Sequence, residues 1–342
     1  MTNTALTNQL VVLAKRPSGA PTLDNFRVEE APLPLPTSGQ MRLKTLYLSL
    51  DPYMRLRMND GASYADPVGV GQAMCGGTVC RVEASQHPGF KDGDLVLAFT
   101  GWQKYALSNG VGVNPLDANM PHPSWVLGVL GMPGFTAYFG LLKIGNPKPG
   151  ETVVVGSATG GVGGVVGQIA KIRGCRAVGI AGGEKKCRYA VEQLGFDVCV
   201  DHRAQDFREQ LAAACPNGID VYFENVGGAV LAAALPLLNV GARVPLCGLI
   251  AWYDGQGISD GPDVATLLST MLVRQIKLQG FVILDYYERY YAEFLTEMGQ
   301  WLTQGKIHYT EQVAEGLEQA PQAFLNLLRG ENFGKVVVHV AD

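Results

Sequence analysis

A strand, a glycine-rich loop and a helix follow one another without a break near the middle of the chain. Thr152-Val-Val-Val155 is typical of a buried strand, and apolar residues recur at helical spacing from Val162 to Ala170. Between them lies Gly156-Ser-Ala-Thr-Gly-Gly-Val-Gly163. Glycines there let the backbone approach a pyrophosphate, which the free N–H groups and positive dipole end of the helix can bind. The loop predicts a dinucleotide site; the alternative is a turn that is merely rich in glycine.

The second half of the chain alternates strands with helices of 10–15 residues. After the glycine loop, strand patterns occur at 177–181, 198–200, 220–223 and 243–246. Helix patterns lie between them at 185–194, 206–215 and 229–238. Such alternation predicts a doubly wound parallel sheet, the Rossmann architecture. A long amphipathic helix is expected over 285–304, and a last strand over 334–341.

The residues before Pro149-Gly150 have a different pattern. Short β-rich runs at 41–48, 78–82 and 94–99 are separated by dense proline and glycine turns. Short strands at such spacing predict a compact β-barrel or sandwich. The chain changes character near residues 145–152, so two domains are expected.

Composition excludes several classes of protein. The net charge of −4 gives no reason to expect a nucleic-acid partner, and no apolar stretch reaches the 18 residues that would suggest a membrane span. Residues 1–10 lack the basic and apolar regions of a secretory signal. The seven cysteines include no C-x-x-C pair, which favours free thiols in a reducing compartment. We therefore expect a soluble, cytoplasmic protein.

The residues after the second Rossmann strand indicate which dinucleotide binds. NAD-binding domains usually carry an acid there for the ribose 2′-hydroxyl, whereas this strand ends Ala181-Gly182-Gly183 and is followed by Glu184-Lys-Lys186. A lysine at this place suits the 2′-phosphate of NADPH, although Glu184 favours the other cofactor. His202 and Arg203 either add donors on the same side or are ordinary solvated residues.

Seven further motifs resemble one protein family over nearly the whole chain. The motifs are Leu48-Ser-Leu-Asp-Pro-Tyr-Met-Arg55, Gly131-Met-Pro-Gly-Phe-Thr-Ala-Tyr138, Val165-Val-Gly-Gln-Ile-Ala-Lys171, Glu224-Asn-Val-Gly-Gly228, Leu246-Cys-Gly-Leu-Ile-Ala-Trp-Tyr253, Gln279-Gly-Phe281 and Asn332-Phe-Gly-Lys335. Together with the glycine loop, they resemble the zinc-independent medium-chain dehydrogenases/reductases. The similar branch contains leukotriene/prostaglandin reductases, alkenal double-bond reductases and bacterial NADPH-dependent curcumin reductases.

The resemblance implies a fold and a set of cofactor contacts. It implies a GroES-like β-barrel domain over residues 1–127 and 310–342, a Rossmann NADPH-binding domain over residues 128–309, and a homodimer. The implied cofactor-binding residues are Gly160, Gly161, Val162, Gly163, Gly183, Lys186, His202, Asn225, Cys247, Tyr253, Phe281, Val282, Ile283 and Asn332. The chain departs from the family at Ser157, where Ala is common, and at His202, where many members have Tyr.

The expected chemistry follows from the absence of a metal motif. Met74-Cys-Gly-Gly-Thr-Val-Cys80 stands where the zinc enzymes of the superfamily place ligands, and it contains no His-Glu pair. Without a Lewis acid, a C=C conjugated to a carbonyl is reduced more easily than an isolated C=O. Hydride adds to the β-carbon, and a hydrogen-bond donor stabilises the developing enolate oxygen.

Two tyrosines are candidates for that donor, because a phenol is neutral at pH 7. Tyr253 follows a late Rossmann strand where the family places a donor, and Tyr53 would approach from the barrel side. The alternative for each is an aromatic side chain packed in a domain wall.

The predicted function is NADPH-dependent reduction of the C=C of α,β-unsaturated ketones or aldehydes, such as curcumin-like diarylheptanoids or alkenals. A quinone reductase and a non-catalytic NADPH-binding protein are the alternatives.

Overall fold

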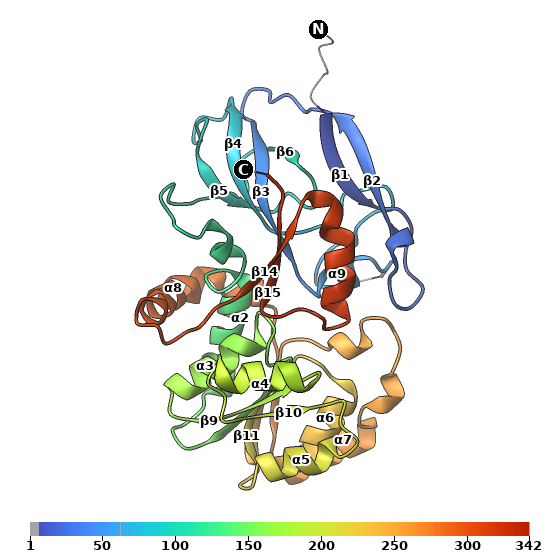
Figure 1. The fold of residues 1–342 in the computed structure, drawn as a ribbon, viewed down its shortest axis with the longest axis vertical. Coiled ribbons are helices and arrows are strands. Elements are labelled where there is room, and N and C mark those ends of the chain that lie inside the picture. Colours follow the sequence, from blue (N-terminus) through green and yellow to red (C-terminus); the bar gives the residue numbers. More distant parts are fainter. Residues whose placement is uncertain (1–6, 62, 342) are drawn as a thin grey trace. The chain divides into compact units, whose positions relative to one another are not determined.

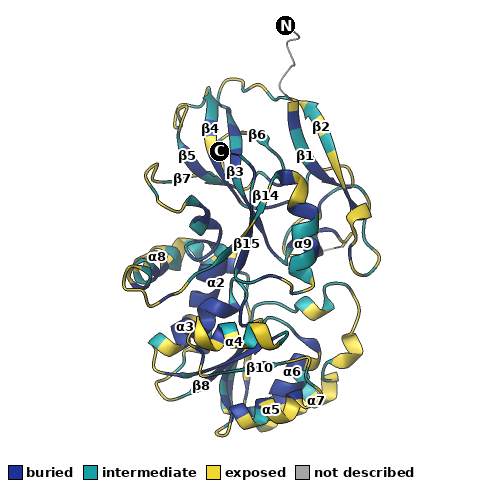
Figure 2. Ribbon diagram, viewed as in Figure 1, coloured by how far each residue is buried: buried dark blue, intermediate teal, exposed yellow. Residues whose placement is uncertain are grey.

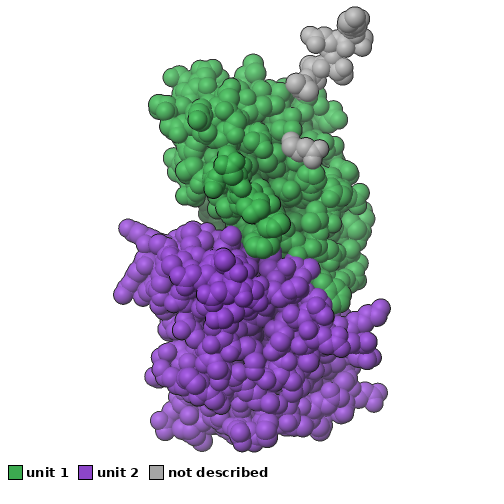
Figure 3. Space-filling view, turned by 60° about the vertical axis from the view of Figure 1, so that its left-hand side comes forward, with its two compact units in different colours: residues 1–128, 311–342 green, residues 129–310 purple. Residues whose placement is uncertain are grey.

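The computed structural model describes residues 7–61 and 63–341, which form two compact units. Residues 1–128 and 311–342 belong to unit 1, and residues 129–310 to unit 2 (Figure 3). Residues 1–6, part of the stretch considered for a secretory signal, lie outside the described residues. Among the described residues, no helix combines the length and apolar character needed to cross a membrane.

Unit 2 is built on a parallel sheet with the strand order β10-β9-β8-β11-β12-β13. The strands are β8 (Thr152–Gly156), β9 (Arg176–Ala181), β10 (Val198–Asp201), β11 (Ile219–Phe223), β12 (Leu238–Leu246) and β13 (Lys277–Gly280). The chain begins in the middle at β8, builds outward to β10, and returns to build the other half from β11. This is the Rossmann order, so the predicted doubly wound sheet is confirmed. Every residue of β8 is buried (Figure 2).

The helices of unit 2 are α2 (Met132–Phe139), α3 (Gly163–Ile172), α4 (Glu184–Glu192), α5 (Phe207–Ala214), α6 (Gly228–Ala234), α7 (Val264–Val273) and α8 (Tyr287–Thr303). Five of them, α3 to α7, connect these strands, whereas α2 precedes β8 and α8 follows β13 (Figure 1). A π-helical turn, Gly140–Gly145, continues α2. Helix α8 buries Phe294, Met298 and Trp301, which recur three and four residues apart. That spacing is the apolar stripe that predicted a helix over 285–304.

Helix α3 packs tightly against Phe196, in the segment before β10, at a point where Gly167 has no side chain. A Cβ added at Gly167 would lie 1.9 Å from the Phe196 ring. A methyl group cannot fit at that distance, so either the helix or the Phe196 ring would have to move. The glycine motif therefore shapes the packing of the helix as well as the loop before it.

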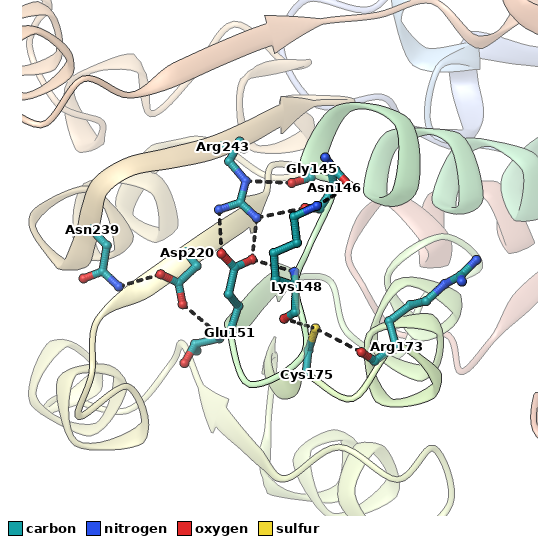
Figure 4. Close-up of polar contacts among 10 residues, drawn as sticks. Gly145, Asn146, Lys148, Glu151, Arg173, Cys175, Asp220, Asn239 and Arg243 are labelled. Atoms are coloured by element: carbon teal, nitrogen blue, oxygen red, sulfur yellow. Dashed lines mark hydrogen bonds and ion pairs between the residues drawn. The ribbon is translucent and has the colours of Figure 1, made fainter.

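A polar network links the strands of unit 2 near their amino ends (Figure 4). The Arg243 guanidinium forms an ion pair with Glu151 and donates to the Gly145 carbonyl at 2.8 Å. Asp220 accepts from the Thr152 N–H at 2.9 Å and from the Asn239 amide at 2.8 Å. These bonds tie β8, β11 and β12 together and leave the carboxyl edge to the loops of the candidate site.

Unit 1 contains a mainly antiparallel sheet and a separate strand pair. The sheet has the order β14-β15-β3-β4-β5-β7, and β6 also pairs with β3. The strands are β3 (Met41–Leu50), β4 (Thr78–Ser85), β5 (Leu95–Ala98), β6 (Tyr105–Ser108), β7 (Asn114–Pro115), β14 (Glu311–Glu315) and β15 (Lys335–His339). The pair consists of β1 (Thr7–Leu13) and β2 (Phe26–Pro32). Two helices, α1 (Met54–Arg57) and α9 (Ala320–Leu328), complete the unit.

The two ends of the chain meet in the sheet of unit 1. Strand β15 pairs antiparallel with β3, so that Val337 lies opposite Ser49. The core beside this pairing contains a buried aromatic group, in which Trp102 stacks on Phe26 at 5.6 Å and meets Phe324 edge-on. The fold class is thus a doubly wound parallel-sheet unit together with a separate β-sheet unit, as the sequence predicted.

Candidate functional site

The strand order of unit 2 creates a switch point between β8 and β11, where ligands of doubly wound sheets bind. The glycine loop leaves β8 there, and Asn225 follows β11. The Asn225 amide donates to the Gly156 carbonyl at 3.1 Å, joining the two strand ends. The sequence that predicted a dinucleotide loop is therefore placed at the ligand-binding edge of the sheet.

The glycine loop is a tight turn that leads into the N-terminus of α3. The Gly160 N–H donates to the Ser157 carbonyl at 2.9 Å, and Gly161 and Val162 then lead into the helix, which begins at Gly163. A Cβ on Gly163 would lie 2.3 Å from the Ser157 oxygen, so only glycine fits. Ser157 itself has a φ of 55°, a left-handed conformation that is costly for a residue with a side chain. Within the turn, the Gly164 N–H donates to the Gly160 carbonyl, and the Val165 and Val166 N–H groups donate to the Val162 carbonyl, each at 3.0 Å, so the N–H groups left for a ligand are those between Gly160 and Gly164.

A second turn follows β9 and is fastened to the end of β10. The Gly183 N–H donates to Asp201 Oδ1 at 2.8 Å, and the Arg203 N–H donates to the same oxygen at 2.9 Å. These backbone bonds outweigh the opposing effect of burial and lower the pKa of Asp201. Gly183 has a φ of 97°, which favours glycine. Asp201 therefore links the two turns, because Oδ1 of its carboxylate accepts hydrogen bonds from the backbone of both. We call this residue the Asp201 clamp.

Three basic side chains gather around this clamp. A Cβ on Gly182 would lie 3.0 Å from both Arg203 Nε and His202 Nε2, so the two side chains stand over the bare backbone of the turn. Lys186 lies in the first turn of α4, which begins at Glu184. Loss of solvent lowers the pKa of His202, and the positive charges of Arg203 and Lys186 lower it further. Arg203 and Lys186 supply the positive charge of this cradle, and the Glu184 carboxylate at the start of α4 pairs with Arg188 instead, so the cradle suits a phosphate group.

Tyr253 lies in the loop after β12, above the backbone of Gly248. A Cβ on Gly248 would be 2.9 Å from the Tyr253 hydroxyl oxygen. Burial raises the pKa of Tyr253, and a hydrogen bond from the Leu249 backbone opposes that rise. The hydroxyl oxygen thus lies close to the backbone of Gly248 and Leu249. Cys247, at the start of the same loop, has a pKa raised to about 12 by burial and is a neutral thiol.

Phe281, Val282 and Ile283, which the resemblance implies bind the cofactor, differ in how far their side chains are exposed. The Phe281 ring packs between Phe139 and Phe223 at 5.8 and 6.5 Å. Val282 is half-buried, whereas Ile283 is buried, so the Ile283 side chain belongs to the core of unit 2 and its backbone is the part left for a ligand.

Asn332 and Tyr53 both lie in unit 1. Asn332 is buried and donates its amide to the Gly334 carbonyl at 2.9 Å. Tyr53 packs against the core of unit 1. Burial raises the pKa of Tyr53 well above its ordinary value, and the Asp51 carboxylate adds to the rise. Tyr53 is thus a neutral phenol whose ring has a packing role in its own unit.

Sequence reasoning missed Asp201, the residue that organises the phosphate-sized cradle. Its position as the last residue of β10 was visible, but the approach of the Gly183 backbone to it is a tertiary event. Within residues 7–61 and 63–341, no group of three or more His, Cys, Asp or Glu side chains is arranged to hold a metal ion.

Comparison with known proteins agrees with this geometry. Residues 9–116 match the family described as the N-terminal domain of oxidoreductase, and residues 161–300 match the family described as zinc-binding dehydrogenase. The chain is 57% identical over 335 residues to NADPH-dependent curcumin reductase of Escherichia coli (strain K12), covering 98% of this chain and 97% of that protein. It is 38% identical over 331 residues to prostaglandin reductase 1 of Rattus norvegicus, covering 95% and 97%.

A solved structure is similar over the same length. CurA from Vibrio vulnificus, in complex with NADPH, superposes with a TM-score of 0.95 at 57% identity, covering 98% of this chain and 99% of that one. The chain belongs to the zinc-independent branch of the medium-chain dehydrogenase/reductase family, together with curcumin reductase and prostaglandin reductase 1.

Proposed function

We propose that this protein is an NADPH-dependent reductase of the C=C bond of α,β-unsaturated ketones and aldehydes. The observation that carries the proposal is the cradle of Lys186, His202 and Arg203 over a bare glycine turn. Its cationic character favours a 2′-phosphate. Of the relatives named above, the Escherichia coli curcumin reductase is NADPH-dependent and Vibrio vulnificus CurA binds NADPH. Curcumin-like diarylheptanoids and alkenals are the substrate classes that the family relationship supports.

The described residues fit the cofactor. Gly160, Gly161, Val162 and Gly163 would hold the pyrophosphate on the first turn of α3, and Gly183, Lys186 and His202 would hold the 2′-phosphate. The residues assigned to the remainder of the cofactor are Asn225, Cys247, Tyr253, Phe281, Val282, Ile283 and Asn332. When bound, NADPH supplies the hydride that the β-carbon of the substrate receives.

The protein's part in the chemical step is to stabilise negative charge on the substrate oxygen. The Tyr253 O–H donates a hydrogen bond to the carbonyl oxygen as it becomes an enolate. A raised pKa keeps this phenol protonated at neutral pH, so it remains a donor throughout. Tyr53 is a second candidate donor, and its packing role in unit 1 is the alternative.

We expect Lys186→Ala to weaken NADPH binding by roughly 10- to 150-fold while NADH binding stays nearly unchanged. A charge-assisted hydrogen bond to the 2′-phosphate contributes about 1.5–3 kcal/mol, and NADH has no such group. The measurement is the dissociation constant of each cofactor by fluorescence titration. Lys185→Ala is the matched control, because Lys185 is the exposed neighbour. Equal losses for both cofactors would remove Lys186 from this role.

The preference for NADPH over NADH should decrease as the pH rises from about 6.5 to 8. The pKa of His202 is lowered in the free protein, and a bound 2′-phosphate would raise it. NADPH binding therefore adds a proton to His202. The attraction between the His202 imidazolium and the 2′-phosphate is lost when the pH exceeds the pKa of His202 in the complex. For an exposed pair we expect a change of about 2- to 5-fold. Cofactor titrations of His202→Ala should show no such slope, and an unchanged slope would contradict the assignment.

We propose that catalysis uses no metal, because hydrogen bonding by Tyr253 replaces a Lewis acid at the oxygen. Prolonged dialysis against EDTA should leave kcat unchanged, and the purified protein should carry no stoichiometric zinc. Elemental analysis that finds one zinc per chain, with activity lost on its removal, would overturn this part of the proposal.

Two alternatives differ from the proposed function in measurable ways. A quinone reductase would oxidise NADPH with quinones and leave enones unreacted, and a non-catalytic NADPH-binding protein would oxidise it with neither. Following NADPH absorbance with matched enone and quinone panels separates the three. The position of Tyr253 at the carboxyl edge favours the enone reductase.

We also propose a cytoplasmic homodimer. The seven cysteines are all free, which suits a reducing compartment. Strand β13 lies at the end of the strand order and is exposed along its length. Helix α7, exposed in Figure 2, carries Val264, Leu268 and Leu272 on one exposed face. An open edge beside an apolar helix is a surface on which a second copy can extend the sheet.

A further inference from the structure

Two of the seven cysteines come together under the first turn of α4. Cys187 lies in that turn, and its N–H donates to the Gly183 carbonyl at 3.2 Å. Cys199 lies in β10 and is paired in register with Gly179 of β9. A Cβ on Gly179 would lie 3.2 Å from Cys199 Sγ, so this thiol stands over bare backbone. Helix α4 packs on both strands, and the two thiols face each other closely enough to share a hydrogen bond.

This pair differs from the other five cysteines in exposure and acidity. Both members are half-buried. The hydrogen bond with Cys199 lowers the pKa of Cys187, and it outweighs the opposing effect of burial. The thiolate is the form that reacts with oxidants, so Cys187 is the cysteine most readily oxidised. Burial raises the pKa of the other five, to about 11 for Cys75, Cys175 and Cys215 and to about 12 for Cys247.

We propose that Cys187 and Cys199 form a reversible disulfide when the protein meets a peroxide. The Cys187 thiolate attacks one oxygen of hydrogen peroxide, the O–O bond breaks, and the released hydroxide takes up a proton to give water. The Cys199 sulfur then attacks the resulting sulfenic acid of Cys187, the S–O bond breaks, and the thiol proton leaves with the oxygen as a second water. The two thiols lose two electrons, which the peroxide gains. A small thiol reverses the reaction by exchange.

The disulfide would act on the cradle, because each cysteine neighbours one of its residues. Cys187 follows Lys186 in α4, and Cys199 stands two residues before the Asp201 clamp. Bonded sulfurs lie only about 2.05 Å apart, closer than two hydrogen-bonded thiols, so oxidation draws the first turn of α4 toward β10. Lys186 moves with that turn. This consequence rests on the proposed function, whereas formation of the disulfide does not.

The test compares the reduced full-length protein with the same protein after mild treatment with hydrogen peroxide. Remaining thiols are alkylated, and the chain is cleaved after glutamate. Cleavage at Glu184, Glu192 and Glu209 puts Cys187 and Cys199 on separate peptides, so their link is visible by mass spectrometry. We expect this link to form before any other cysteine is oxidised and to disappear with dithiothreitol.

Three variants make the result specific to the pair. Cys199→Ser should leave Cys187 as a sulfenic acid that dimedone traps, whereas Cys187→Ser should give neither the link nor the adduct at Cys199. Cys175→Ser is the matched control, because the buried Cys175 thiol donates to the Lys148 carbonyl at 3.3 Å and a serine can also donate there. It should form the link as the wild type does. Prior oxidation of another cysteine, or a link between other cysteines, would overturn the proposal.

The effect on the cradle is measured on the same oxidised and reduced samples. We expect oxidation to weaken NADPH binding by roughly 10-fold, the lower end of the effect of losing one charge-assisted bond, and to change NADH binding less. Cys187→Ser treated with peroxide should keep the NADPH affinity of its reduced form. An unchanged NADPH affinity in the linked protein would overturn the coupling to the cradle. Equal losses of NADPH and NADH would instead count against the assignment of Lys186 and leave the disulfide standing.

Discussion

Lys335→Met should lower the free energy of unfolding by about 3–5 kcal/mol, because it leaves the buried Asp51 carboxylate without a positive partner. The Lys335 side chain is 3% exposed, and its ammonium donates to Asp51 Oδ1 at 2.9 Å and to the Leu50 carbonyl at 2.6 Å. Asp51 also accepts from the Ser49 hydroxyl. These bonds join the start of β15 to the end of β3, where the two ends of the chain meet. Urea denaturation measures the loss.

A surface ion pair provides the matched control for this experiment. Lys15 and Asp24 are 62% and 80% exposed and lie 3.7 Å apart, so Lys15→Met should cost less than about 1 kcal/mol. A second variant, Lys335→Met with Asp51→Leu, removes both charges and should recover much of the stability. Equal small losses from Lys335→Met and Lys15→Met would show that the buried pair does not hold unit 1 together.

Tyr253→Phe should lower kcat by about 10², the lower end of the effect of losing one oxyanion donor. The ring is kept, and only the hydroxyl that would bond the enolate oxygen is lost. Water can partly replace the phenol, which is why the lower end is expected. The measurement is kcat for an enone at saturating NADPH, and the KM should change less than kcat if the bond forms mainly in the transition state.

Another tyrosine of unit 2 serves as the control for Tyr253→Phe. The Tyr291 hydroxyl donates to the Leu130 carbonyl at 2.8 Å, and burial raises its pKa to about 12. Tyr291→Phe should therefore lower stability by about 1 kcal/mol and leave kcat unchanged. A wild-type kcat in Tyr253→Phe would exclude donation by this hydroxyl, and a loss of similar size in both variants would indicate a general structural effect.

The sequence predicted the Rossmann half well because local signals there agree with the tertiary structure. Apolar residues from Val162 to Ala170 belong to the helix that follows the glycine loop. The helix expected over 185–194 ends at Glu192, two residues earlier than expected. The helix expected over 229–238 ends at Ala234 instead. Pro236 lies in a 3₁₀ turn that follows it, and β12 begins at Leu238, five residues before the expected strand.

Elements without periodic patterns were not predicted. Strand β13, Lys277–Gly280, is exposed along its length and has no alternation of apolar and polar residues. Strands β1 and β2 pair with each other across the turn that contains Leu23–Asn25, and neither was expected from its pattern. Their strand structure depends on a partner that local composition does not reveal.

The candidate site was partly predictable for the same reason. Lys186 and His202 each follow a strand of the parallel sheet, so their gathering at one edge could be expected from topology. The role of Asp201 could not, because it depends on two turns meeting at one carboxylate oxygen.

The proposed reaction adds hydride from NADPH to the β-carbon of an enone. The most direct test supplies NADPH deuterated at the transferred position together with an enone, and identifies the product by mass spectrometry and NMR. We expect a saturated carbonyl compound with one deuterium on the former β-carbon. An allylic alcohol with the C=C intact and deuterium on the carbinol carbon would contradict it.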